Sequence, residues 1–283
     1  MKVACVQCNV EFNDPAANVK RIVYHIAKEK QRDCDLIVLP ECALTGYCVG
    51  SAEQAKEISL DDWQVEGNTV VRYPAVIQPI VDAAQQYGVV VIVGYAGFEK
   101  GKVINGALLI EPSGNVSRYA KTHLPELGLD RYVEPGNDLP VFDTAVGKIG
   151  ILICFDIRMP EAIRTLALKG AEIVCLPTNW PRGAEVSADL LSPARAAENR
   201  VFLATCNRVG EENGFGFIGR SGIFDVGGKA LARASDQEET IRADIDLALA
   251  RIKRNVTIPG VHETTVFESR RPELYGALTE PTG

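Results

Sequence analysis

The chain has 283 residues, of which 46% are hydrophobic and 24% are charged, and its formal net charge is -7. This composition is typical of a globular protein, and an acidic chain without a basic run argues against nucleic acid or an anionic membrane surface as the main partner. No apolar stretch reaches the length of a membrane span, and the chain starts in a strand pattern rather than a signal peptide. We therefore expect a cytoplasmic protein whose eight cysteines are unpaired.

The first predicted strand, over residues 2–8, contains Cys5 and Cys8 in a C-x-x-C spacing. Such a spacing occurs in redox and zinc sites. In a strand, however, residues three apart point to opposite faces, and no second cysteine pair follows at zinc spacing. The spacing therefore predicts no metal or redox site.

A helix is predicted from Asp14-Pro15, and a second buried strand over 35–40 is followed directly by Glu41. In open α/β sheets, binding sites form at the carboxyl ends of the strands. Glu41 is thus either a site carboxylate or an ordinary loop acid, and its position alone leaves both interpretations open.

The middle of the chain predicts a helix over 69–87, which Pro74 and Pro79 should kink or split, and then strands over 89–93, 103–110 and 116–120. Lys121 stands at the end of the last strand, where a lysine is usually a solvated edge residue. A long acidic loop, residues 125–140, comes next, and long loops inside compact domains are often functional.

An apolar run from Ile149 to Ile153 leads into Cys154, and a helical pattern begins at Pro160. A cysteine on such a strand-to-helix turn lies at the sheet edge, with helix N–H groups nearby to stabilise a thiolate. The alternative is a small core cysteine, because free cysteines are among the most buried residues.

The segment 171–177 repeats the pattern of 34–40, in which an acid, four apolar residues and a proline follow one another. This repeat suggests two similar α/β halves related by a pseudo-twofold axis. The remainder predicts a helix over 184–200, four strands over 201–245, a short helix over 246–254 and an irregular tail from about 255. Because no segment has the composition of a linker, residues 1–283 are expected to form a single domain.

Glu41, Lys121 and Cys154 carry flanking sequences that resemble the three signatures of the nitrilase, or carbon-nitrogen hydrolase, superfamily. The matching stretches are Leu39–Tyr47, Tyr119–Pro125 and Ile153–Glu161, and Arg195–Arg200, Asn207–Gly210 and Gly219–Asp225 resemble later motifs of the superfamily. Each motif alone is weak evidence, whereas all of them in order are specific. The resemblance runs from the first strand to Arg271–Tyr275.

This resemblance implies an α/β fold, a four-layer α-β-β-α sandwich. It also implies that subunits pair through the helices beside the Cys154 motif into a homodimer or larger homo-oligomer. Cys154 is implied as the nucleophile that forms a thioester, Glu41 as the general base, and Lys121 as the cation that stabilises the oxyanion, with the backbone N–H of Phe155 as a second donor. No metal or organic cofactor is implied.

Many relatives carry a second glutamate five residues before the acid of a Glu-Pro-Gly motif, which is Glu134-Pro-Gly136 here. The matching position holds Leu129, and two acids lie near it, Asp130 and Glu126. We expect one of them to take the place of the missing glutamate. Asp130 is favoured because it is adjacent to the matching position, while Glu126 precedes the flexible Gly128.

The resemblance favours an amidase or ω-amidase type of thiol hydrolase, which cleaves a non-peptide C–N bond of a small amide. Phe155 stands where true nitrilases usually have tryptophan, so a nitrilase is disfavoured. The close alternative is an N-carbamoyl amino acid or amine amidohydrolase. Pocket shape is expected to depend on Tyr47, the 125–140 loop, Asn179 and Trp180.

Arg158 has two interpretations, a bidentate partner of a substrate carboxylate or a surface or interface salt bridge. Two further function classes remain open. One is a Cys–His hydrolase with His123 as base, although the sequence suggests no residue to orient the imidazole. The other is a binding scaffold with a dead site, which the complete Glu-Lys-Cys set disfavours. The sequence leaves the identity of the substrate and the size of the oligomer open.

Overall fold

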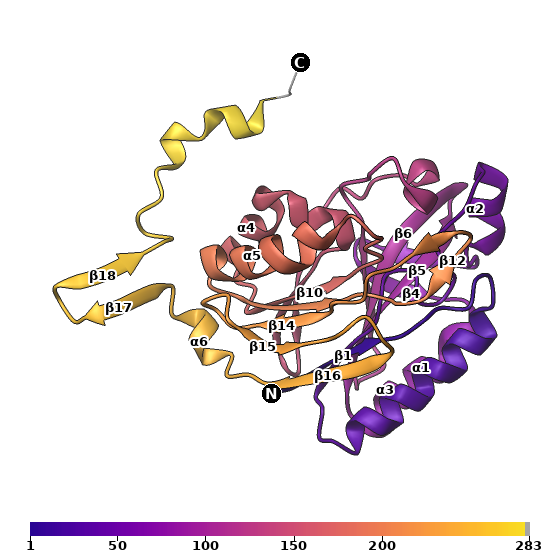
Figure 1. The fold of residues 1–283 in the computed structure, drawn as a ribbon. Helices are drawn as coiled ribbons and strands as arrows, with labels where there is room; N and C mark the ends of the chain where they lie inside the picture. Colours follow the sequence, from indigo (N-terminus) through magenta and orange to yellow (C-terminus); the bar gives the residue numbers. More distant parts are fainter. Residues whose placement is uncertain (281–283) are drawn as a thin grey trace.

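The computed structural model describes residues 1–280, which form two β-sheets packed face to face with helices on their outer faces (Figure 1). The strands of the larger sheet are β1 (Lys2–Gln7), β2 (Leu36–Val38), β3 (Gln64–Glu66), β4 (Thr69–Arg72), β5 (Val90–Glu99), β6 (Lys102–Ile110), β7 (Val116–Ala120) and β16 (Glu239–Asp244). The strands of the smaller sheet are β8 (Val141–Thr144), β9 (Gly147–Ile151), β10 (Ile173–Pro177), β11 (Phe202–Cys206), β14 (Gly222–Phe224) and β15 (Ala230–Arg233).

The α-helices are α1 (Pro15–Lys30), α2 (Ala52–Ile58), α3 (Gln78–Tyr87), α4 (Pro160–Leu168), α5 (Ser192–Asn199) and α6 (Ala248–Arg251). Two small hairpins form separate two-stranded sheets and are not hydrogen-bonded into either main sheet. They are formed by β12 (Glu211–Glu212) with β13 (Phe215–Gly216), and by β17 (Arg254–Ile258) with β18 (His262–Thr265).

The two sheets repeat one topology. The larger sheet has the order β16-β1-β2-β5-β6-β7-β4-β3, and the smaller one, read from β8, has the order β8-β9-β10-β11-β14-β15. Each begins with an antiparallel edge strand and continues with three parallel strands, followed by two antiparallel strands in the smaller sheet and four in the larger one. Helices α1 and α3 connect the parallel strands of one half, as α4 and α5 connect those of the other. This correspondence supports the two predicted halves.

The layers follow from which face of each sheet is apolar. Side chains from both sheets form the central core, which includes Cys5 and Ile92 of the larger sheet and Ile151 of the smaller one. Helices α1 and α3 cover the opposite face of the larger sheet, where Cys8 also packs, and α4 and α5 cover the smaller sheet (Figure 1). The four-layer α-β-β-α sandwich is therefore confirmed, and Cys5 and Cys8 point to opposite sides of the sheet.

Two predicted helices are shorter than expected. In place of a helix over 69–87, the segment forms β4, a 3-10 turn (Ala75–Ile77) and α3. Pro74 holds an extended backbone that stops the helix from reaching further back, and the β-branched residues before it pair with β3 and β7. The predicted helix over 184–200 is present as a continuous helical stretch over 185–199, with a π-helical turn (Ser187–Leu191) before α5, whereas the helix over 246–254 is reduced to α6.

The tail from about 255 was expected to be irregular, and this expectation is wrong for its first part. The β17–β18 hairpin and two 3-10 turns (Pro272–Leu274 and Gly276–Thr279) extend away from the sandwich (Figure 1). Residues 281–283, the end of the expected tail, lie outside the described residues. Within residues 1–280, no helix combines the length and apolarity needed to cross a membrane.

Candidate active site

Glu41 lies just beyond strand β2, and its side chain is completely buried. A glycine on the neighbouring strand makes this possible. A Cβ atom at Gly94 would lie 2.4 Å from the backbone nitrogen of Cys42 and 2.6 Å from Cα of Glu41. The loop after β2 therefore passes directly against the backbone of β5 and directs Glu41 into the space between the sheets.

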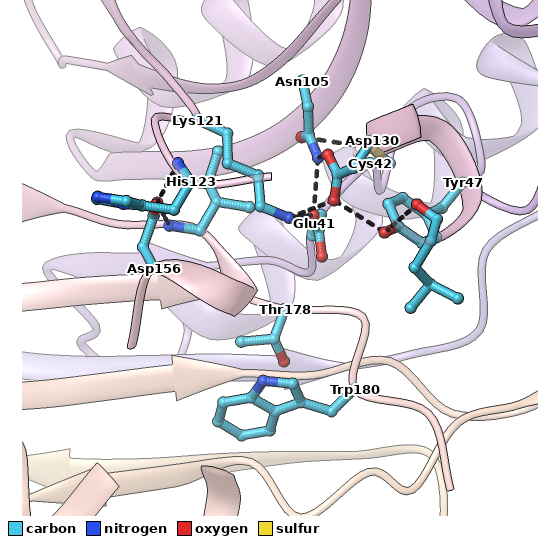
Figure 2. A network of polar contacts seen from close by, with 12 residues as sticks. Glu41, Cys42, Tyr47, Asn105, Lys121, His123, Asp130, Asp156, Thr178 and Trp180 are labelled. Carbon is cyan, nitrogen blue, oxygen red and sulfur yellow. Dashed lines mark hydrogen bonds and ion pairs between the residues drawn. The ribbon is translucent and has the colours of Figure 1, made fainter. Parts of the chain in front are cut away.

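Lys121 follows β7 and is also completely buried. Its Nζ lies 2.8 Å from Oε1 of Glu41 and 2.6 Å from Oδ2 of Asp130 (Figure 2). Asp130 comes from the 3-10 turn Gly128–Tyr132 in the long loop. The two carboxylates compensate the cost of burying the ammonium group, because a buried charge requires paired and hydrogen-bonded partners.

Asn105 connects the two carboxylates. From its position on β6, its Nδ2 donates to Oε1 of Glu41 and to Oδ1 of Asp130, at 2.8 Å each (Figure 2). The hydroxyl of Tyr47 donates to Oδ2 of Asp130 at 2.8 Å. Five side chains from separate parts of the chain thus form one closed polar network, with the lysine nitrogen at its centre.

Cys154 lies at the turn that links β9 to α4 and begins a 3-10 turn (Cys154–Arg158). Its φ angle of 44° lies in the left-handed region, which is strained for a residue with a Cβ atom. The carboxylate of Asp156 stabilises this turn, because it accepts hydrogen bonds from the backbone N–H of Ile153 at 2.8 Å and from the hydroxyl of Tyr119 at 2.7 Å. The predicted strand-to-helix turn is therefore present, with Cys154 partly exposed.

The electrostatics of the site follow from burial and the two carboxylates. Burial raises the pKa of Glu41 above its ordinary value, despite the opposing effect of Lys121. Burial and the charge of Glu41 raise the pKa of the Cys154 thiol, while Lys121 and the backbone N–H of Asn179 act in the opposite direction. Burial alone would lower the pKa of Lys121, but Asp130 and Glu41 hold it well above its usual range. The resting site thus favours a thiol beside a basic carboxylate.

The structure brings only some of the expected pocket residues together. Asp130 and Tyr47 join the Glu41–Lys121 network, and Phe155 directly follows Cys154 in the same turn. Asn179 is 1% exposed, and both polar atoms of its side chain are buried without a hydrogen-bond partner among residues 1–280. Of these residues, Tyr47 and Asn179 also line one small hollow.

Three others lie elsewhere. Glu126 is exposed, so the structure does not bring it to Lys121. Arg158 is exposed at the end of its 3-10 turn, and its backbone carbonyl accepts from Arg195. Trp180 is 2% exposed, and its side chain packs in the apolar core rather than in the polar network. These three residues are close to the site residues along the chain, but their side chains point away from the site.

His123 does have an orienting acid, contrary to the expectation from sequence. Its Nδ1 lies 2.7 Å from Oδ1 of Asp156, and its backbone N–H donates to the same oxygen. Strand β7 ends at Ala120, so Lys121 and His123 do not share a strand face, and the imidazole points away from the Lys121 ammonium (Figure 2). This geometry places His123 in the support of the cysteine turn.

The sequence reasoning missed Asn105, Asp156 and Asn207. Asn207 accepts from the hydroxyl of Thr178 at 2.9 Å and from the backbone N–H of Trp180 at 2.8 Å, and thereby fixes the loop that carries Asn179. The sequence does contain a signal for Asn105, because an asparagine inside the apolar run of 102–110 would be buried and would need hydrogen-bond partners. Within residues 1–280, no group of three or more His, Cys, Asp or Glu side chains is arranged to hold a metal.

Comparison with known proteins agrees with this geometry. Residues 2–255 match the carbon-nitrogen hydrolase family model. The chain is 35% identical over 277 residues to a nitrilase of Pyrococcus abyssi, covering 97% of this chain and 99% of that protein. It is 30% identical over 276 residues to 2-oxoglutaramate amidase of Bacillus subtilis, covering 96% and 98%.

Among solved structures, the chain resembles Nit3 of Saccharomyces cerevisiae, a member of branch 10 of the nitrilase superfamily. The TM-score is 0.78 at 26% sequence identity, with 89% of this chain and 92% of that chain covered. The fold, the match across nearly the whole length and the similarity to curated relatives agree with one another. The chain therefore belongs to the carbon-nitrogen hydrolase family.

Proposed function

We propose that this protein is a thiol amidase, which hydrolyses the C–N bond of a small non-peptide amide through a Cys154 thioester and releases ammonia or an amine. The observation that carries the proposal is the state of Glu41. Its Oε1 accepts from Lys121 and Asn105, whereas Oε2 is buried without a hydrogen-bond partner among residues 1–280. A buried carboxylate oxygen without a donor is costly for stability, and it is available to accept a proton during the reaction.

In the first half of the reaction, the Cys154 sulfur attacks the amide carbon while Oε2 of Glu41 takes the thiol proton. The raised pKa of Glu41 makes it a stronger base. The Lys121 ammonium and the Phe155 N–H stabilise the oxyanion that forms. The C–N bond then breaks, and the proton on Glu41 passes to the leaving amine.

In the second half, water attacks the thioester carbon and gives its proton to the same Glu41 oxygen. The C–S bond breaks, and that proton returns to the sulfur, so that the free enzyme is restored and a carboxylic acid is released. Asn105 and Asp130 keep Lys121 and Glu41 in place throughout, because each carboxylate bonds both the ammonium group and the amide.

The test is ammonia release from a panel of short amides, N-carbamoyl compounds and nitriles. We expect turnover of at least one amide, loss of about 10³-fold or more in kcat in Cys154→Ala, and an acyl adduct on the Cys154 peptide when the wild-type protein is quenched with acid during turnover. Glu41→Gln should not form this adduct from the amide, because it lacks the base for acylation. The matched control is Cys175→Ala, a buried cysteine of β10, which should keep kcat and lose about 1 kcal/mol of stability.

Other outcomes separate the alternatives. Ammonia from N-carbamoyl compounds alone would establish the carbamoyl amidohydrolase, and turnover of nitriles alone would establish a nitrilase. If no compound is hydrolysed and iodoacetamide labels no cysteine at an unusual rate, the chain is a scaffold with a dead site.

We further propose that two or more copies associate through α4 and α5 and that the protein resides in the cytoplasm. Exposed apolar side chains on α4 and the tail, such as Leu168, Leu274 and Leu278, support an interface, and eight free cysteines support a reducing compartment. Sedimentation velocity and cell fractionation test these points, and a monomer at micromolar concentration would overturn the first. The shared core predicts a single unfolding transition, as for one domain.

A further inference from the structure

A buried ion pair outside the Glu41–Lys121 network binds the backbone of the loop that carries Tyr47. Glu212, on β12, is 4% exposed. Its Oε1 accepts hydrogen bonds from the backbone N–H groups of Tyr47 at 2.8 Å and Cys48 at 2.6 Å. Asn213 adds a third bond from the same hairpin, from its Nδ2 to the carbonyl of Cys48 at 2.6 Å.

Arg208 holds Glu212 in position. Its side chain is completely buried, and its Nη1 lies 2.5 Å from Oε2 of Glu212. Its Nη2 donates to Oδ1 of Asn9 at 2.9 Å and to the carbonyl of Val10 at 3.1 Å. The guanidinium also lies 4.4 Å from the ring centroid of Phe217. The arginine is thus fixed on several sides, and the glutamate has little freedom to move.

The loop that carries Tyr47 packs closely against the Glu212 carboxylate. Gly46 has a φ angle of +88°, and a Cβ atom there would lie 2.7 Å from Cδ2 of Phe12 and 3.1 Å from Oε2 of Glu212. A side chain at this position would therefore separate the loop from the carboxylate. The direct contact between Glu212 and the loop depends on this glycine.

Tyr47 transmits this contact to the reaction centre. Its hydroxyl donates to Oδ2 of Asp130, the same oxygen that lies 2.6 Å from Nζ of Lys121. Its carbonyl accepts from the backbone N–H of Leu129 at 2.9 Å, within the turn that carries Asp130. Both ends of Tyr47 thus hold Asp130, and Glu212 holds the Tyr47 backbone.

We propose that Glu212, paired with Arg208, is a positioning residue for the reaction, and that it acts through Tyr47 to keep Asp130 on the Lys121 ammonium. This inference rests on the proposed amidase function for its kinetic test. It also predicts a change in Cys154 reactivity that needs no amide substrate. A purely structural ion pair would stabilise the fold without affecting kcat or the reactivity of Cys154.

The kinetic test compares Glu212→Gln with Glu29→Gln. Glu29 is a completely buried glutamate on α1 that pairs with Arg242 of β16, remote from the loop of Tyr47. Both variants lose one buried ion pair, so similar decreases in Tm are expected. We expect kcat to fall about tenfold or more in Glu212→Gln with a smaller change in KM, and to stay within twofold in Glu29→Gln. Equal kcat in the two variants would overturn the proposal.

A double-mutant cycle tests the route through Tyr47. Tyr47→Phe keeps the ring and removes the hydroxyl that holds Asp130. If Glu212 acts through this hydroxyl, the losses in kcat from Glu212→Gln and Tyr47→Phe will be clearly less than additive. Full additivity would mean that Glu212 acts by another route, and the proposal would fail.

Alkylation of Cys154 by iodoacetamide, followed by peptide mass spectrometry at a fixed pH, gives the readout without substrate. The charge of Asp130 raises the pKa of the Cys154 thiol, so displacement of Asp130 should increase the alkylation rate. We expect a threefold or larger increase in Glu212→Gln and in Tyr47→Phe, and no change in Glu29→Gln. If Glu212→Gln does not fold, Glu212→Asp provides the same comparison with the charge retained, and an unchanged rate there would refute the proposal. Failure of amide turnover in the wild type would reject the amidase function and leave this measurement valid.

Discussion

Asp130 and Lys121 form a fully buried ion pair in which Oδ2 lies 2.6 Å from Nζ, closer than the 2.8 Å between Nζ and Oε1 of Glu41. The lysine is therefore shared between two carboxylates that Asn105 also connects. Asp130 stands one residue beyond the position where relatives often carry a glutamate, and a 3-10 turn brings its shorter side chain to the lysine.

We predict that Asp130→Asn lowers kcat about 100-fold, equivalent to about 2.7 kcal/mol of transition-state stabilisation. Without the charge of Asp130, the Lys121 ammonium would pair more closely with Glu41 alone. Steady-state kinetics on the best amide, with thermal melts to check folding, measure the effect. Glu126→Gln is the matched control, because Glu126 is exposed on the same loop, and its kcat should be unchanged. Near-normal kcat in both variants would mean that three residues suffice.

The pH profile provides a second prediction. Glu41 must be ionised to accept the thiol proton, and its pKa is raised by burial, so kcat/KM should fall on the acid side at a pH above the ordinary glutamate pKa. The hydrogen bond from Asn105 lowers the pKa of Glu41. Asn105→Ala should therefore raise that pKa further and move the acid limb to higher pH. An acid limb that stays in place, or moves to lower pH, would contradict the assignment of Glu41 as base.

Gly94→Ala should impair both stability and activity. The added Cβ would meet backbone atoms of Cys42, Glu41 and Pro40 at 2.4–2.6 Å, and backbone cannot rotate away as a side chain can. We expect a loss of about 1–3 kcal/mol and a displaced Glu41 that lowers kcat. Gly97→Ala, on the same strand, is the control, because its Cβ meets the side chains of Tyr95 and Trp63. Equal kcat losses at both positions would show that general strain, not the placement of Glu41, limits activity.

Substrate charge gives a fourth prediction. Two buried carboxylates face one ammonium in the site, and the small hollow beside Tyr47 and Asn179 is lined by Leu127, Pro181, Phe215 and Phe217, with no basic residue among its lining. Arg158, for which one of the two interpretations was a partner of a substrate carboxylate, is exposed elsewhere. We expect kcat/KM for a neutral aliphatic amide to exceed that of an amide of equal chain length with a terminal carboxylate by tenfold or more. The reverse preference would establish the ω-amidase alternative.

The sequence alone determined the main elements, because short apolar runs predict buried strands and the ends of such strands converge in an α/β fold. Strand position alone left the roles of Glu41, Lys121 and Cys154 open, and the flanking motifs that resemble the superfamily led to their prediction as the central residues. The repeat of 34–40 in 171–177 predicted two similar halves, which the strand orders of the two sheets support. These signals are local, so they can be read along the chain.

Only the tertiary structure decided which other polar residues join the centre. Asp130 and Glu126 lie four residues apart on one loop, yet the 3-10 turn directs one to Lys121 and leaves the other exposed. Asn105 reaches the site from a separate strand, and Glu212 binds the backbone of Tyr47 from a separate hairpin. Their contacts depend on the direction of each side chain in the folded protein and on the packing of segments that are far apart in sequence. Neither of these features produces a local pattern in the amino-acid sequence.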